Sequence, residues 1–437
     1  MNNLKAFTDY KKDWIDSIIS LHMKIICQEI LKKTKKVDSI ILVGGFGRGE
    51  GSIKIIKNHE LIPLKDYDLI VVSNHIISLK DYISLVSNIH NALKIPTGWY
   101  YKAAPGHFHV NIKFINQKSL KKLPPDISNY ELKNASKIIY GSDIRHLIPI
   151  RKDDITYSSG LRVLLNKIIG LLENFPYDSS LFHKDAHLAE SCIYECGKVY
   201  LEIATALTIL MGCYEATYKG RALNFKKNYK KLPNLHNKLP NLYENIKKFT
   251  KLKLRPEYNK LDIDPFDLWH STSDDLIQVL MYYFEYITKK NSRDPLIFIK
   301  KFPHFLELYY YFPYLEYYLK EFFISNRLLV HFGSLLLQIY ENFRYLKNNK
   351  QFFTLRNIIS KKSPIIKIYS AALSILFSIK NAKNKTFFIK NTIKSLKDIY
   401  PLQNLQNDIE TNIDIIRKAC IKAHKLYELE KISKSTF

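Results

Sequence analysis

Five glycines cluster directly after a run of branched apolar residues near the amino terminus. They occupy positions 44, 45, 47, 49 and 51 of "ILVGGFGRGEGS" (residues 41–52), and the whole chain has only 14 glycines. Fixing glycine costs more backbone entropy than fixing any other residue, so such a cluster is expected where a turn must let another group come very close. The preceding "SIILV" is typical of a buried strand. The segment therefore predicts a strand that ends in a tight turn with something packed against it.

Length and charge limit the class of protein. A chain of 437 residues with 46% hydrophobic residues is expected to form two or three domains. The formal charge of +26 comes from dispersed lysines, which favours a solvated basic surface, with attraction of nucleotides or RNA as the alternative. Five cysteines without metal-type spacing, and no long apolar run, predict a reduced, cytoplasmic protein with no membrane partner.

Strand and helix signals alternate in the first third of the chain and then give way to helix signals alone. Strands are predicted at 39–45, 66–72 and 107–115, and helices at 8–34, 78–95 and 126–143, with 53–64 as an inserted loop. From about Tyr157 the patterns are helical, except for 226–267, which is predicted to be a linker or a pair of loops. This order predicts an α+β protein, in which a small mixed sheet is followed by all-helical domains.

Two familiar phosphate-binding loops do not match the glycine cluster. A P-loop requires Gly-Lys followed by Ser or Thr, whereas Arg48 is followed by Gly49 and Glu50. The dinucleotide fingerprint requires a glycine at the position that holds Glu50 or Ser52 in the two possible alignments. The glycine turn therefore does not bind its partner group through either of these two motifs.

Two acids on the next predicted strand provide an explanation. In "DYDLIVV", Asp66 and Asp68 are two residues apart, so both carboxylates point to one face of a strand. Carboxylates this close repel unless a cation neutralises them, and their oxygens suit Mg²⁺, which takes its other ligands from phosphates and water. A glycine turn followed by Asp-x-Asp is what a phosphoryl-transfer site with a metal-bound triphosphate requires.

At these residues the sequence resembles the DNA polymerase β-type nucleotidyltransferase superfamily, which includes aminoglycoside adenylyltransferases and minimal nucleotidyltransferases. The resemblance covers about residues 36–145 and rests on "GGFGRGEGS" followed by "DYDLIVV". It implies a nucleotidyltransferase-like domain at 1–150, a helical bundle packed on the active-site cleft at 151–235 and a C-terminal all-helical domain at 236–437.

The resemblance also implies roles for individual residues. Gly44 and Gly45 would let the backbone approach the β- and γ-phosphates, Arg48 would contact a phosphate oxygen, and Ser52 would donate a hydroxyl. Asp66 and Asp68 would hold Mg²⁺ or Mn²⁺.

The position of the family's third carboxylate holds Asn111 in "HVNIKF". An amide oxygen can ligate a cation, but it brings no charge and cannot take a proton. His107 and His109 are expected on the same strand face, so either could act as the base, and Glu50 is a further candidate.

The resulting hypothesis is an enzyme that transfers a nucleoside monophosphate, AMP in the first instance, from a metal-bound nucleoside triphosphate to the hydroxyl of an acceptor. The acceptor is open between a small molecule, a protein and tRNA. One alternative, motivated by Asn111, is a catalytically weakened nucleotidyltransferase that serves as a nucleotide-binding or partner-binding scaffold. A second, motivated by the charge, is an RNA-binding or RNA-modifying protein.

Two further motifs contain residue types that could contribute to a site. A second Asp-x-Asp, at Asp262 and Asp264, precedes Pro265 and lacks a glycine turn, so it is predicted to be a capped loop at a helix start. Tyr214, Tyr218 and Arg221 lie within two turns of one another. Either the three residues face the active-site cleft or they form a plain structural turn.

Overall fold

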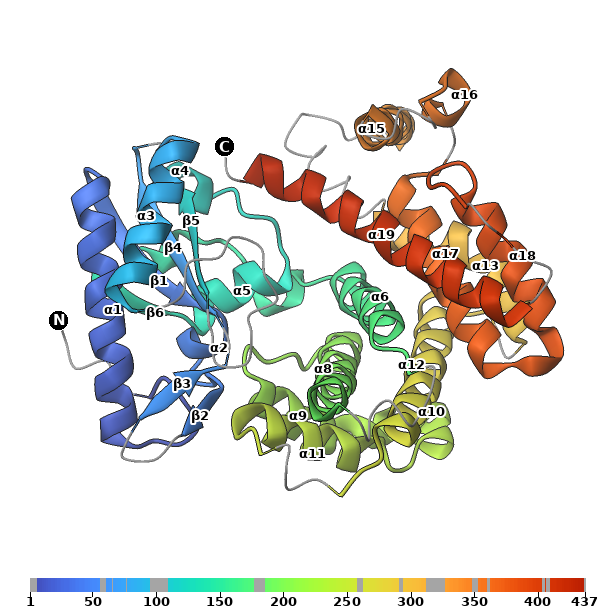
Figure 1. The fold of residues 1–437 in the computed structure, drawn as a ribbon, viewed down its shortest axis with the longest axis horizontal. Helices are drawn as coiled ribbons and strands as arrows, with labels where there is room; N and C mark the ends of the chain where they lie inside the picture. Colours follow the sequence, from blue (N-terminus) through green and yellow to red (C-terminus); the bar gives the residue numbers. More distant parts are fainter. Residues whose placement is uncertain are drawn as a thin grey trace.

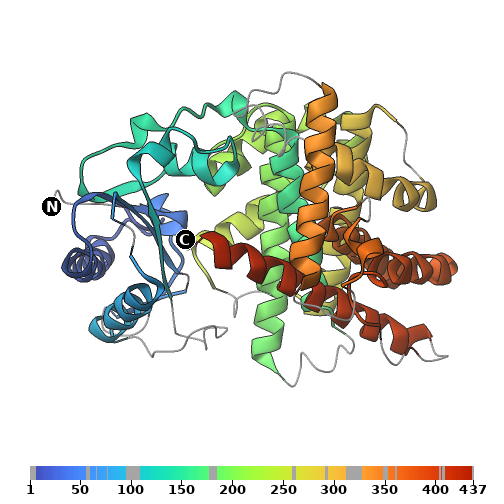
Figure 2. The ribbon, with the colours of Figure 1, turned by 90° about the horizontal axis from the view of Figure 1, so that it is seen from above.

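The structure is a computed structural model of the whole chain (Figures 1 and 2). It describes residues 6–55, 60–64, 66–75, 77–94, 109–176, 185–257, 262–290, 294–311, 327–347, 353–359, 362–402, 405 and 409–435.

A four-stranded mixed sheet organises the amino-terminal part. Its strands are β1 (Val37–Val43), β4 (Tyr67–Ser73), β5 (Val110–Ile115) and β6 (Lys137–Gly141), in the order β5-β4-β1-β6. β1 runs antiparallel to both β4 and β6, whereas β4 and β5 are parallel. The α+β class predicted from the sequence is confirmed.

Both faces of the sheet are covered, which is why β1 carries the uninterrupted apolar run Ile40, Ile41 and Leu42. On one face lie α1 (Asp13–Lys33) and α3 (Leu79–Ala92), which share a core with β1 and β4. On the other face lie α4 (Gln117–Leu120), α5 (Ile127–Asn134) and the 3₁₀ turn η2 (Arg145–Leu147). Figure 2 shows the blue helices and the teal segment on opposite sides of the sheet.

Three predictions in this part of the chain are corrected. The helix predicted at 126–143 ends at Asn134, and the following "KIIYG" forms β6, because its apolar and β-branched residues fill the sheet edge beside β1. The predicted loop 53–64 contains a two-stranded hairpin of β2 (Ile53–Ile55) and β3 (Leu61–Pro63). The first helix begins at Asp13 instead of residue 8.

The secondary structure of the described residues after β6 is helical. Its elements, after the 3₁₀ turn η3 (Lys152–Asp154), are α6 (Tyr157–Glu173), α8 (Ala186–Leu210), α9 (Tyr218–Asn228), η4 (Tyr229–Lys231), α10 (Pro233–Lys238), α11 (Leu242–Leu254), α12 (Pro265–Thr288), α13 (Pro295–Leu306), η6 (Glu307–Tyr311), α15 (Arg327–Lys347), α16 (Leu355–Ile358), α17 (Pro364–Lys380), η8 (Ala382–Asn384), α18 (Lys385–Leu396) and α19 (Ile409–Ser435).

One continuous hydrophobic core joins these helices, with members from Leu161 to Tyr427. Its central element is α17, which is apolar on every face and buried from Pro364 to Ser378. Cys192 and Cys196 of α8 belong to this core as packing residues.

Most of the described residues in the segment 226–267 are helical, so its prediction as a linker or loops was wrong. Prolines explain the error, because they occur here at or just before helix starts, where the missing N–H costs nothing. Pro233 is the first residue of α10, and Pro240 lies two residues before α11. Pro265 begins α12, and Asp264 caps it by accepting from the backbone N–H groups of Phe266 and Asp267, as predicted.

Within the described residues, no helix is both long enough and apolar enough to cross a membrane.

Candidate functional site

The glycine turn lies directly against the second aspartate. β1 ends at Val43, which pairs with Asp68 of β4, and the chain then forms the single helical turn α2 (Gly44–Gly47). Gly44 has a φ of +65°, and a Cβ atom added there would lie 2.6 Å from Oδ2 of Asp68. Glycine is therefore required at this position both by the backbone and by the carboxylate beside it.

Asp66 and Asp68 lie at the start of β4 and share one hydrogen-bond partner. The side-chain amide of Asn111, which pairs with Asp68 across the sheet, donates to Oδ1 of Asp68 at 3.0 Å and to Oδ2 of Asp66 at 3.3 Å. The two carboxylates therefore converge on a single group, as their spacing on the strand predicts. Asp66 also accepts from the backbone N–H of His109 at 3.3 Å.

The electrostatics of the pair disfavour two negative charges. Burial raises the pKa of the Asp68 carboxyl, and the neighbouring Asp66 raises it further. The hydrogen bond from Asn111 and the positive charge of Arg48 act in the opposite direction. A divalent cation at this position would relieve the repulsion that remains.

A cavity of about 230 Å³ connects these residues to the helical part of the chain. Its walls on the sheet side include the glycine turn, with Gly44, Gly45 and Arg48, and both aspartates. The opposite wall comes from α8, α9 and α11, with Tyr194, Lys198, Leu201, Glu202, Tyr218 and Lys253.

The helical wall was not identified from the sequence. Tyr194, Lys198 and Glu202 are four residues apart along α8 and so lie on one face of that helix. Lys198 and Glu202 share α8 with two further charged residues, Glu190 and Glu195, so their spacing does not single them out in the sequence. Lys253, near the end of α11, is not singled out either, because lysines are frequent throughout that segment.

Arg48 holds the glycine turn to the helical part instead of pointing freely into the cavity. Its Nη1 lies 2.5 Å from Oε2 of Glu131 on α5, its Nε lies 3.5 Å from Glu50, and its guanidinium stacks on the Tyr218 ring at 4.9 Å. Only 8% of its side chain is exposed. Arg48 was predicted to bind a phosphate oxygen, and the structure commits its charge to carboxylates of the protein.

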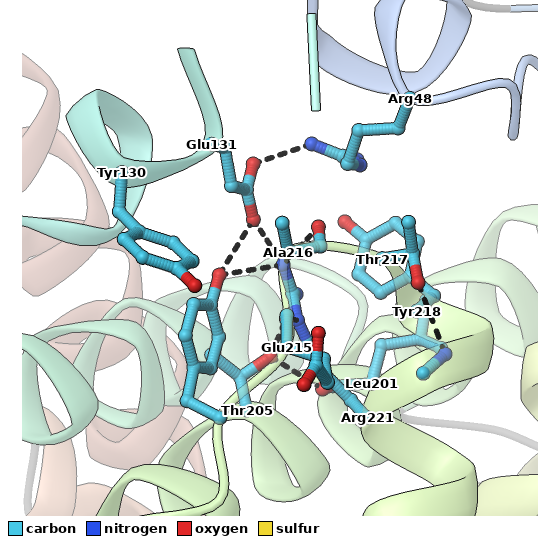
Figure 3. Close-up of polar contacts among 12 residues, drawn as sticks. Arg48, Tyr130, Glu131, Leu201, Thr205, Glu215, Ala216, Thr217, Tyr218 and Arg221 are labelled. Carbon is cyan, nitrogen blue, oxygen red and sulfur yellow. Dashed lines mark hydrogen bonds and ion pairs between the residues drawn. The ribbon is translucent and has the colours of Figure 1, made fainter. Parts of the chain in front are cut away.

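Glu131 is the centre of this cluster (Figure 3). Besides Arg48, it forms an ion pair with the buried Arg221 of α9 and accepts a hydrogen bond of 2.8 Å from the hydroxyl of Tyr214. Burial would lower the pKa of the Arg221 guanidinium, but the charge of Glu131 raises it, so the arginine stays charged. Sequence reasoning grouped Tyr214, Tyr218 and Arg221 correctly but missed Glu131, which is 83 residues before Tyr214.

Glu50 and Ser52 also hold the two parts together. The Glu50 carboxylate accepts from the backbone N–H groups of Tyr218 and Lys219 at 2.9 and 3.0 Å, so it caps the start of α9 and is not placed as a base. Ser52 lines the cavity, but its hydroxyl donates to the Lys253 carbonyl at 2.7 Å and accepts from Lys253 Nζ at 2.9 Å.

His109 lies at the entrance to β5. Its ring packs edge-on against His90 of α3, with centroids 4.9 Å apart, and it is not among the residues that line the cavity. His107, the other predicted base, lies outside the described residues.

The donor set fits a magnesium ion that brings phosphate and water ligands with it. Among the described residues no group of three or more histidine, cysteine, aspartate or glutamate side chains is placed to hold a metal. The aspartate pair alone meets the need of Mg²⁺, which commonly takes one or two protein carboxylates and completes its octahedron with substrate phosphates and water. The Asn111 amide can present its oxygen instead of its nitrogen after rotation about its last side-chain bond.

No protein-family model matches the sequence, and no curated protein matches it. Among solved structures, one that matches is the spectinomycin adenyltransferase AAD(9) from Enterococcus faecialis with ATP and spectinomycin. The TM-score is 0.33 and the sequence identity 15%, over 59% of this chain and 98% of that chain. That neighbour is a nucleotidyltransferase by its name, and at this TM-score the likeness carries no argument about this chain.

Proposed function

We propose that the protein is a nucleotidyltransferase that transfers a nucleoside monophosphate, AMP in the first instance, from a Mg²⁺-bound nucleoside triphosphate to an acceptor hydroxyl. The observation that carries the proposal is the packing of Gly44 against Asp68, which brings the glycine turn and both aspartates into one cavity wall. Lys198 and Lys253 face them from the helical wall of the same cavity.

The size and charge of this cavity suit a polyphosphate tail. Small-molecule sites commonly measure about 300–1,000 Å³, so a cavity of about 230 Å³ fits part of a nucleotide better than a whole one. Lys253, which donates to Ser52, and Lys198, which pairs with Glu195 at 2.8 Å, bring positive charge to this wall, and the aspartates would hold the cation that the phosphates share. Mg²⁺, when bound, would neutralise charge on the phosphoryl group as it is transferred.

The reaction proposed is a single displacement. The acceptor hydroxyl oxygen forms a bond to the α-phosphorus, and the bond from that phosphorus to the oxygen bridging the β-phosphate breaks. Pyrophosphate leaves with the electron pair, and the hydroxyl proton passes to solvent water. The protein contributes alignment and charge stabilisation, which account for most of the catalysis in phosphoryl transfer.

The test is pyrophosphate release by the full-length protein with ATP, MgCl₂ and a small-molecule extract of the source cells. Asp66→Asn and Asp68→Asn are expected to lower release at least 100-fold, because each removes one charge from the cation site. Asp262→Asn is the matched control, since it makes the same change in the other Asp-x-Asp pair, away from the cavity. Full activity of either aspartate variant contradicts the proposal.

A second candidate function is favoured by Asn111. Its amide nitrogen bridges both carboxylates in the place where a third carboxylate would complete the site. A protein that binds MgATP in a calorimetric titration but releases no pyrophosphate would be a nucleotide-binding scaffold. The RNA-binding alternative stays a prediction from net charge.

A further inference from the structure

A second, larger cavity of about 1070 Å³ adjoins the first at Gly44 and Asp68. It extends around the β5 edge of the sheet, with α4 and α5 on one face and α3 on the other. Its polar lining includes His75, Lys113, Lys118, Ser119, Ser128 and Asn129. No role has been given to these residues so far, and the volume is ample for a small organic molecule.

The two cavities meet at the centre of the proposed site. Gly44 and Asp68 line both of them, whereas Asp66 lines the smaller and Asn111 the larger. In a phosphoryl transfer the attacking and leaving oxygens lie roughly in line on opposite sides of the phosphorus. If the pyrophosphate lies in the smaller cavity, the acceptor must reach the phosphorus from outside that cavity, and the larger cavity is the space that adjoins the same aspartate.

We propose that the larger cavity binds the acceptor, and that the acceptor is a small, anionic molecule bearing hydroxyl groups. This inference rests on the proposed transferase function, and it names the substrate class of the same site. Among ligands of this chemistry, sugar phosphates and hydroxy acids present both a hydroxyl for transfer and a negative charge for the lysines.

The charges of the lining decide between an anionic and a cationic acceptor. Among the described residues, the carboxylates that line the cavity are those of Asp68 and Glu131. Asp68 belongs to the proposed cation site, and Glu131 is neutralised by Arg48 and Arg221 (Figure 3). The remaining charges are positive.

Lys113 and Lys118 supply that positive charge. Both side chains are exposed, and neither forms an ion pair with another described residue. Among the described lining residues, a polycationic acceptor would meet these two ammonium groups and no carboxylate outside the cation site and the Glu131 cluster, whereas an anionic acceptor gains two charge-assisted hydrogen bonds.

The hydroxyl and amide groups of the lining are the reason for proposing an acceptor that bears hydroxyl groups. Ser119 and Ser128 can both donate and accept, and the Asn129 side chain adds an amide to the same lining. Such groups match the mixed donors and acceptors of a polyhydroxylated molecule. Apolar side chains such as Ile70 and Ile115, on the sheet face that α5 covers, also line the cavity and can cover its carbon skeleton.

The experiment separates the small molecules of the source cells on anion and cation exchangers before the reaction. Each fraction is incubated with the full-length protein, [α-³²P]ATP and MgCl₂, and label transferred to small molecules is measured. We expect the acceptor in the fraction retained by the anion exchanger. An acceptor in the cation-exchange or unretained fraction, label found only on protein or RNA, or no labelled product at all contradicts the proposal.

Charge reversal of two lysines in the larger cavity tests whether the acceptor binds there. With the anionic fraction as probe, Lys113→Glu/Lys118→Glu is expected to raise the KM for the acceptor at least tenfold and to leave the Kd for MgATP within twofold. Lys12→Glu/Lys24→Glu is the matched control, because it makes the same change on exposed residues at α1, away from both cavities. An unchanged KM in the cavity variant contradicts the location.

The outcomes distinguish failure of the acceptor-site proposal from failure of the transferase function on which it rests. Failure of the wild-type protein to bind MgATP contradicts the transferase function and, with it, the acceptor site. MgATP binding together with a cationic acceptor leaves the transferase function in place and contradicts only the nature of the larger cavity's ligand.

Discussion

Arg48 in the glycine turn and Glu131 on α5 form an ion pair of 2.5 Å, although 82 residues separate them in the chain. The pair is 8% and 15% exposed and is extended by Arg221 from the helical part. The glycine turn is thereby fixed from two directions, by its own sheet and by α9. The shape of the smaller cavity depends on this cluster, because its two walls come from the parts that the cluster joins.

Glu131→Gln is expected to destabilise the protein by about 3–5 kcal/mol, because removing one member of a buried pair leaves charge uncompensated. Here Arg221 and Arg48 lose a carboxylate partner at once, and Arg48 keeps only Glu50, at 3.5 Å. The free energy of unfolding in urea measures the effect. Glu244→Gln is the matched control, since Glu244 forms an exposed pair with Lys247 that contributes about 0–1 kcal/mol. Equal effects of the two substitutions would mean that the cluster is not a structural centre.

Gly44→Ala is expected to abolish pyrophosphate release, because the new Cβ would lie 2.6 Å from Oδ2 of Asp68 and displace that carboxylate. The strain of a positive φ alone costs about 1–2 kcal/mol. Gly212→Ala separates the two effects, since Gly212 has a φ of +67° and nothing within 4 Å of an added Cβ. Both variants should lose similar stability from strain, and only Gly44→Ala should lose activity. Loss of activity in both would contradict a specific contact with Asp68.

Local signals in the sequence predicted the parts of the site that a single segment defines. The apolar run, the glycines and the two-residue spacing of Asp66 and Asp68 each report on neighbouring residues, and they place β1, α2 and β4. The wall formed by Lys198, Glu202 and Lys253 depends on how two parts of the chain pack. No local pattern encodes that packing.

The strand β6, which the sequence did not predict, shows that packing also decides the structure within one short segment of the chain. "DISNYELKN" forms a helix, and "KIIYG" directly after it has apolar residues that also fit a continued helical period. The edge of β1 lies beside "KIIYG", and pairing with β1 makes this segment a strand instead of a continued helix. Tertiary context of this kind overrides local propensity.

Asp68→Asn is expected to stabilise the protein at neutral pH in the presence of EDTA, while it abolishes transfer. Burial raises the pKa of Asp68 in the folded state above its value in the unfolded chain. Ionisation therefore opposes folding at any pH above the raised pKa. As pH falls through that pKa, the wild-type carboxyl takes up a proton and this penalty disappears.

The measurement is the thermal midpoint of unfolding of both proteins between pH 7 and pH 3. The advantage of Asp68→Asn should shrink on acidification, because only the wild-type protein gains from protonation at this position. Asp262→Asn, an exposed change of the same kind, should show no such trend. An advantage that does not change with pH would mean that the substitution acts through packing and not through charge.

Asn111→Asp is expected to destabilise the metal-free protein and to strengthen its binding of Mg²⁺. The Asn111 amide donates to both carboxylates, and hydrogen bonds to charged groups contribute about 1.5–3 kcal/mol each. An aspartate would remove these donors and add a third negative charge to the pair, which raises the repulsion that a cation relieves.

Asn111→Ala removes the donors without adding the charge, so the difference between the two variants isolates the electrostatic part. Thermal unfolding with EDTA and then with increasing MgCl₂ measures both effects, because a ligand that binds only the folded state raises its stability by an amount that grows with the logarithm of its affinity. Asn111→Asp should have the lowest midpoint in EDTA and the largest rise with MgCl₂. An equal rise in the wild-type protein and both variants would show that the cation does not bind at these side chains.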